Sequence, residues 1–109
     1  MHWLFVIEFP LFGLLLIGAS IPLILRRIPP NWIYGFKLPK TVNNPDIWYK
    51  ANECSGKLMA IAGAVITLAS VVLGMLGMSD HAYLTLMILV ATVSLGITVI
   101  ASLIYLKTL

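Results

Sequence analysis

Three residues in the middle of the chain have types and a spacing that suit contact with a second stretch of backbone. Trp48, Asn52 and Gly56 recur at i, i+4 and i+8, so a helix would place them in one line on one face. The Asn52 amide can donate and accept hydrogen bonds, and Gly56 leaves room for a close approach. We expect this line either to hold a lid over the helix ends or to form a binding surface for a peptide or lipid.

Glu8 is the one acid within a long apolar segment. An ionisable group in hydrocarbon is expensive to bury, which makes it a functional candidate, a possible intramembrane site. It lies about two turns into the segment, near enough to interfacial water for an anchoring role as well. His2, Asp80 and His81 belong to the same side of the predicted membrane, but their spacing matches no ligand motif, so we predict no metal.

Patterns that would indicate catalysis are missing from the sequence. It has no nucleophile and base in a known spacing, no glycine-rich phosphate cradle, and no HExxH or CxxC motif. Cys54 is the only cysteine, so it has no partner for an internal disulfide, and we interpret it as structural. We therefore predict no enzyme activity and no cofactor.

The composition indicates a membrane protein. Hydrophobic residues make up 61% of the 109 residues and charged residues 10%, a balance that a soluble domain of this size could not keep in solution. The length allows a single domain, residues 1–109. Basic residues cluster beside apolar segments, so the lipid bilayer and its anionic headgroups, and not nucleic acid, are the expected partner.

Three apolar segments, residues 3–25, 58–78 and 82–106, are each long enough to cross a bilayer as a helix. The first lacks a basic leader and a cleavage site, so we expect it to be retained. The short connection at 79–81 makes the second and third segments an antiparallel hairpin. The predicted fold is all-α, an integral membrane protein with three transmembrane helices.

Small residues in the second and third segments predict close helix packing. In the third segment, Ser94, Thr98 and Ser102 recur at i, i+4 and i+8. Three helices leave much surface exposed, so a homo-oligomer is an open expectation. The small residues of the second segment and of the residues just before it are Gly56, Ala60, Gly63, Ala64, Thr67, Ser70, Gly74 and Gly77.

Residues 26–57 form the one sizeable polar segment, with six basic and two acidic side chains and a net charge of +4. By the positive-inside rule this loop belongs in the cytoplasm, which places the N-terminus outside and the C-terminus inside. Lys50 and Lys57 can meet lipid phosphates there.

The same loop is predicted to be proline-rich and partly helical. Prolines make residues 28–40 extended or turning. Asn44-Pro45-Asp46 then has the pattern of an N-cap, a proline in the first turn and an acid beside it, so a helix should start there. That helix is either a short interfacial one or an extension of the second transmembrane helix.

The loop also carries a multi-residue motif. The run PPNWIYGFKLPKT at 29–41, followed by NNPDIWYKAN at 43–52 and by Gly56-Lys57 ahead of a transmembrane hairpin, resembles the SdpI-type family of bacterial membrane proteins, over about residues 29–63. Lys37-Leu38 stands where Arg-Thr is common, which keeps the charge but loses the planar guanidinium. Glu53-Cys54 occupies a variable patch. The chain is similar to the short, single-module members, without the extra helices of larger ones.

The resemblance implies a place in the bacterial cytoplasmic membrane and protection against a membrane-active peptide toxin by binding or sequestration. Some members of the family also signal through a cytoplasmic regulator, so the resemblance implies a second role of this kind. The motif positions carried over as binding positions are Pro30, Asn31, Gly35, Lys37, Pro39, Trp48, Asn52 and Gly56.

Two further functions fit the same features. One is a small oligomeric transporter or lipid-handling protein, in which Glu8 and the hydroxyls of Ser94, Thr98 and Ser102 would face a polar cavity. The other is an accessory subunit of a larger membrane complex, for which small-residue helix faces are suited.

Overall fold

The computed structural model describes residues 3–35 and 38–109, and this part of the chain is helical without strands. Its helices are α1 (Trp3–Ile24), α2 (Pro39–Val42), α3 (Pro45–Met75) and α4 (Asp80–Lys107). Three of them, α1, α3 and α4, are long and apolar enough to cross a membrane. The long axis of the molecule is 49 Å, well beyond the roughly 30 Å of hydrocarbon in a bilayer. The predicted all-α fold with three transmembrane helices is confirmed.

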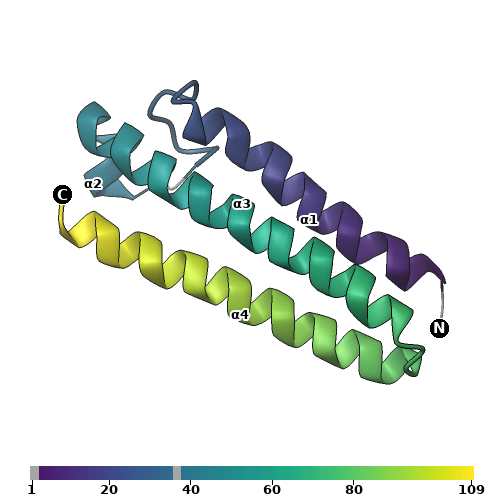
Figure 1. The fold of residues 1–109 in the computed structure, drawn as a ribbon. Helices are drawn as coiled ribbons and strands as arrows, with labels where there is room; N and C mark the ends of the chain where they lie inside the picture. The colour runs from purple at the N-terminus through teal and green to yellow at the C-terminus, as the bar shows by residue number, and fades with distance from the viewer. Residues whose placement is uncertain (1–2, 36–37) are drawn as a thin grey trace.

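The three long helices lie side by side with α3 in the middle (Figure 1). α3 packs against α1 on one side and α4 on the other. The loop, α2 and the C-terminus lie at one end of the molecule, which we call the loop end. The turn between α3 and α4 and the start of α1 lie at the opposite end, the hairpin end.

The predicted helix start at Asn44 is confirmed, and the helix is continuous with the second membrane segment. Asn44 is the N-cap with extended backbone, Pro45 is at the first helical position, and Asp46 lies in the first turn. From there α3 runs unbroken to Met75. Residues 45–57 are therefore an extension of the transmembrane helix and do not form a separate interfacial helix.

The hairpin turn lies slightly earlier than the predicted 79–81. α3 ends at Met75 and α4 begins at Asp80. Gly77 has φ +69, a left-handed backbone that glycine adopts without strain, and it ends the helix instead of contributing to a packing face. Ser79 Oγ then accepts a hydrogen bond of 3.2 Å from the backbone N–H of Ala82, which caps α4.

Close contact between α1 and α3 depends on two glycines that face each other. A Cβ on Gly63 would lie 2.5 Å from the carbonyl oxygen of Gly13, and a Cβ on Gly13 would lie 2.6 Å from the carbonyl oxygen of Gly63. Real Cβ atoms do not come this close, so only bare backbone fits on either side. The small residue at 63 is thus used for packing, as predicted.

Candidate functional site

Asn31 folds the start of the loop at the loop end. Its side-chain Nδ2 donates to the carbonyl of Pro29 at 2.8 Å. Its Oδ1 accepts from the backbone N–H groups of Ile33 at 2.8 Å and Tyr34 at 2.6 Å. This turn, which follows Pro30, satisfies backbone groups that a proline-rich stretch cannot pair in a helix. The motif residue Asn31 therefore shapes the loop directly after Pro30.

Trp48 joins this loop to α3. Its side chain is fully buried, and its indole Nε1 donates to the carbonyl oxygen of Ile28 at 2.7 Å. Four residues later, the buried Asn52 donates from Nδ2 to the Trp48 carbonyl at 3.0 Å. A buried tryptophan needs a partner for its N–H, and here a loop carbonyl provides it.

Gly35 completes this contact. Its φ is +112, and a Cβ would lie 2.7 Å from Asn52 Oδ1 and 3.1 Å from the Trp48 ring. The loop backbone at Gly35 thus lies directly on Trp48 and Asn52. Only glycine, which has no side chain, fits at this position. We call Ile28, Gly35, Trp48 and Asn52 the loop anchor.

Gly56, the third member of the line, receives the end of α1 instead of the loop. A Cβ there would lie 3.1 Å from the Ser20 carbonyl oxygen and 3.2 Å from Leu23 Cβ. Trp48, Asn52 and Gly56 thus lie on one face of α3, and each of them contacts another segment of the chain. The line binds two consecutive segments, the end of α1 and the loop that follows it.

Pro39 starts the short α2, which packs on α3. Thr41 is buried, and its hydroxyl both donates to the Leu38 carbonyl and accepts from the Leu38 N–H, each at 2.8 Å. Lys40 Nζ donates to the Leu106 carbonyl oxygen at 2.9 Å, which connects α2 to the last turn of α4. The C-terminal part of the loop is therefore attached to α3 through α2 and to α4 through Lys40.

A charged cluster lies beside the loop anchor. Arg26 Nε and Nη2 donate to Glu53 Oε2 at 2.9 and 2.7 Å, and Lys57 Nζ lies 3.6 Å from Glu53 Oε1. The Arg26 hydrogen bond holds the pKa of the Glu53 carboxyl below its ordinary value. Glu53 lies on the N-terminal extension of α3, ahead of the apolar membrane segment.

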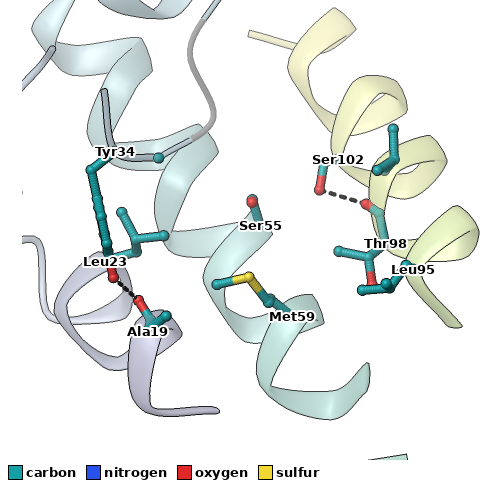
Figure 2. A pocket seen from close by; sticks show the side chains of 10 residues that line it. Ala19, Leu23, Tyr34, Ser55, Met59, Leu95, Thr98 and Ser102 are labelled. Atoms are coloured by element: carbon teal, nitrogen blue, oxygen red, sulfur yellow. Dashed lines mark hydrogen bonds between the residues drawn. The ribbon is translucent and has the colours of Figure 1, made fainter. Parts of the chain in front are cut away.

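An open groove, which we call the α1/α4 groove, lies over α3 next to the loop anchor, with a volume of about 510 Å³ (Figure 2). Its floor is Ser55 and Met59 of α3, and Tyr34 lies at its loop side with its hydroxyl donating to the Ala19 carbonyl. The lining is mostly apolar. The groove is lined by Ala19 and Leu23 of α1, Tyr34 and Gly35 of the loop, Ser55 and Met59 of α3, and Leu95, Thr98, Val99 and Ser102 of α4.

The same face of α3 is filled at the hairpin end. Ile66 follows Ser55 by about three helical turns and is fully buried with Tyr83 and Met87 of α4. The rings of Tyr83 and Phe9 meet edge to face, 5.9 Å apart, so α1 and α4 meet there across α3. Large side chains close one end of the face, and the small Ser55, Ala19 and Ser102 leave the other open.

The Ser102 and Thr98 hydroxyls donate to backbone carbonyls of α4, and Thr98 Oγ1 also lies 3.4 Å from the Leu58 carbonyl oxygen of α3. Ser102 Oγ donates to the Thr98 carbonyl at 2.6 Å, and Thr98 Oγ1 donates to the Ser94 carbonyl at 2.9 Å (Figure 2 shows the first). These residues lie beside a groove that is mostly apolar, so their hydroxyls add little polarity to it.

The structure brings the motif residues Gly35, Trp48 and Asn52 into contact and places Glu8 away from them. Glu8 is exposed on α1, about 16 Å along the helix axis from Ala19 of the groove. Lys37 lies outside the described residues. Sequence reasoning missed Met59 and Val99 as groove residues, because nothing in an apolar helix distinguishes a groove-facing side chain from a lipid-facing one.

The comparison with protein families identifies the family of the chain. A family model described as the SdpI/YfhL protein family matches residues 27–106, which include the loop anchor, α3 and nearly all of α4. No curated protein and no solved structure matches the chain significantly. The matched region covers well over half of the sequence, and the chain belongs to the SdpI/YfhL protein family.

Proposed function

We propose that the protein is an immunity-type protein of the bacterial cytoplasmic membrane that protects against a membrane-active peptide. It does so by binding a helical segment of that peptide in the α1/α4 groove. The observation that carries this proposal is an open, mostly apolar groove next to the family motif loop. The resemblance of the loop motif to the immunity family supports the choice of a peptide as the ligand.

The packing of the three helices favours a helix as the occupant. With α3 in the middle, α1 and α4 lie on its two sides, and near the loop end Ser55 and Met59 form the floor of the groove between them. A fourth helix laid there would contact all three helices, as in a four-helix bundle. Small side chains such as Ala19 and Ser102 permit the close approach that helix association in lipid requires.

Binding at this groove also suggests how a signal would leave the membrane. Tyr34 and Gly35 belong to both the groove wall and the motif loop. An occupant that moves Tyr34 would move the loop, which we place in the cytoplasm, where a regulator could recognise it. We propose that the protein acts by binding, without catalysis.

A transporter fits these contacts less well. It would use Glu8 together with Ser94, Thr98 and Ser102 around a polar path. Glu8 lies far from this stripe, and the Thr98 and Ser102 hydroxyls donate to backbone carbonyls of α3 and α4 instead of facing a polar path. An accessory role in a larger complex would use the same exposed groove with a different helix as its partner.

Two neighbouring residues of α4 provide a matched test. Val99 lines the groove and is 54% exposed, whereas Ile100 is 60% exposed and does not line it. Val99→Trp would fill the groove, and Ile100→Trp would place the same ring toward lipid. We expect cells making wild type or Ile100→Trp to survive a panel of membrane-active peptide toxins that kills control cells, and cells making Val99→Trp to lose protection.

Membrane abundance of the three proteins is measured by immunoblot, so that loss of protein is not mistaken for loss of binding. Equal protection by Val99→Trp and wild type would show that the groove is not the binding site. Failure of wild type to protect against any toxin, including those encoded beside its gene, would overturn the immunity proposal itself.

A further inference from the structure

A second groove follows the crevice between α3 and α4 and has different lining residues from the α1/α4 groove, apart from Thr98. It consists of three adjoining hollows. Leu58 belongs to both the first and the second hollow, and Val65 and Ser94 belong to both the second and the third. The three hollows therefore adjoin one another along this crevice, and together we call them the α3/α4 groove.

The loop end of this groove is cationic. Lys50 and Lys57 line it, two turns apart on one face of α3, with Tyr105 of α4 across from them. The Lys50 and Lys57 side chains are 45% and 61% exposed, and their ion pairs are long, 3.4 Å to Asp46 and 3.6 Å to Glu53. Arg26 holds Glu53 at 2.7 Å, so the carboxylate at this mouth is already neutralised. Arg26, Lys50 and Lys57 thus outnumber the Asp46 and Glu53 carboxylates, and the mouth of the groove keeps a net positive charge that attracts an anion.

The rest of the groove is apolar and about one leaflet deep. From Leu58 to Val65 it follows α3 for roughly 10 Å, and along α4 it continues from Thr98 to Leu89, roughly 13 Å. Half of the hydrocarbon core of a bilayer is about 15 Å thick. The groove therefore begins with cations at headgroup level and ends near the middle of the membrane.

The cationic mouth and the apolar length of the α3/α4 groove together indicate which molecule binds there. We infer that the α3/α4 groove binds one anionic phospholipid of the surrounding bilayer, with its phosphate at Lys50 and Lys57 and an acyl chain lying along Leu58 and Val65. Charge complementarity at the mouth and the apolar length together match this molecule. A second copy of the chain, paired here about a twofold axis, would bring four lysines together at one interface. The inference does not depend on the immunity proposal.

The charge part of this proposal is tested by lipid competition. The purified full chain in mild detergent is given equal amounts of phosphatidylglycerol and phosphatidylcholine with identical acyl chains, and bound lipid is counted by native mass spectrometry. We expect one phosphatidylglycerol to be preferred. Lys50→Gln with Lys57→Gln should reduce the preference by more than about tenfold, since each lysine near anionic lipid contributes about fivefold.

The control for net charge is Arg27→Gln with Lys107→Gln, which removes two positive charges at the same end from exposed residues outside the groove. This pair should keep the preference. An equal loss in both double variants, or no preference in the wild type, would overturn the proposal, because a general surface charge or an unselective annulus would then explain binding.

The acyl-chain part is tested by two isoleucines one turn apart on α4. Ile97 lines the groove and is 59% exposed, and Ile100 is 60% exposed outside it. Ile97→Trp should lower the amount of bound phosphatidylglycerol, whereas Ile100→Trp should not. Unchanged binding in Ile97→Trp, or a dimer mass that appears as lipid is removed and disappears as it is added back, would overturn the assignment of lipid to this groove.

Discussion

Arg26 combines two roles at the junction between α1 and the loop. Its φ is +59, so it stands in the left-handed position that ends a helix, where glycine is usual. The Arg26 N–H donates to the Leu23 carbonyl and the Arg27 N–H to the Pro22 carbonyl, the two hydrogen bonds of a Schellman ending. The side chain meanwhile binds Glu53. Arg26 therefore occupies a backbone position that favours glycine, and its side chain forms an ion pair with Glu53.

Substitution at Arg26 separates these roles. Arg26→Gly and Arg26→Ala both lose the ion pair, but only glycine relieves the left-handed backbone. We expect Arg26→Gly to be more stable than Arg26→Ala by about 1 kcal/mol in thermal unfolding in detergent micelles. Equal stability of the two variants would show that the backbone at this position costs nothing.

Glu53 gives the ion pair a defined pH dependence. Because its pKa is lowered in the folded protein, the pair stabilises the fold above the unfolded pKa, about 4.3. This contribution is lost as the pH falls through the lower folded pKa. The coupling between Arg26→Gln and Glu53→Gln, measured as melting temperatures in a double-mutant cycle, should be present at pH 7 and decline below about pH 4. A coupling that is independent of pH would contradict the pairing.

At the scale of helices, the pairing of α1 with α3 is set by backbone contact. Gly13 and Gly63 face each other, and a Cβ on either would overlap the carbonyl oxygen of the other. Gly56 repeats this arrangement near the loop end, against Ser20 and Leu23. Close approach matters more in lipid than in water, because no hydrophobic effect drives two apolar helices together.

Gly63→Ala should therefore loosen α1 from α3 and lower stability by about 1–3 kcal/mol through overpacking. Gly18→Ala and Gly96→Ala are the matched controls, since a Cβ at either position meets nothing within 4 Å. These controls should be neutral or slightly stabilising, by up to about 1 kcal/mol. Thermal unfolding of all three variants in the same detergent checks this, and an equal effect at 18 and 63 would contradict the contact.

At the scale of the whole molecule, the distribution of charge and the helix topology favour the same orientation in the membrane. The loop, α2 and the C-terminus share the loop end, where Arg26, Lys50 and Lys57 also lie (Figure 1). The hairpin turn lies at the other end with the start of α1. A membrane in which the loop end faces the cytoplasm satisfies the positive-inside rule for every connection of the chain.

Labelling with a thiol reagent that cannot cross membranes tests this orientation. In a Cys54→Ser background, Thr108→Cys and His81→Cys each place one cysteine at an exposed position, at the loop end and the hairpin end respectively. We expect His81→Cys to react in intact cells whose outer surface is accessible and Thr108→Cys only after lysis. The reverse pattern would invert the orientation, and with it the leaflet to which both grooves belong.

Much of this architecture was accessible from the sequence because its causes are local. A bilayer leaves backbone groups no partner but their own helix, so long apolar runs become helices wherever they occur. The start of α3 at Asn44 and Pro45 and the shared face of Trp48, Asn52 and Gly56 follow from helix geometry alone. The position of the hairpin turn was less well predicted, because Gly77 suits a packing face and a helix end equally well.

The amino-acid sequence therefore predicts the number of membrane helices, the polar loop with its motif, and the line of Trp48, Asn52 and Gly56 on one helix face. The fold brings Trp48 to the Ile28 carbonyl and Arg26 to Glu53, and it leaves a groove between α1 and α4 over Ser55 and Met59. These contacts join residues far apart along the chain. They depend on how whole helices cross, which local spacing does not specify.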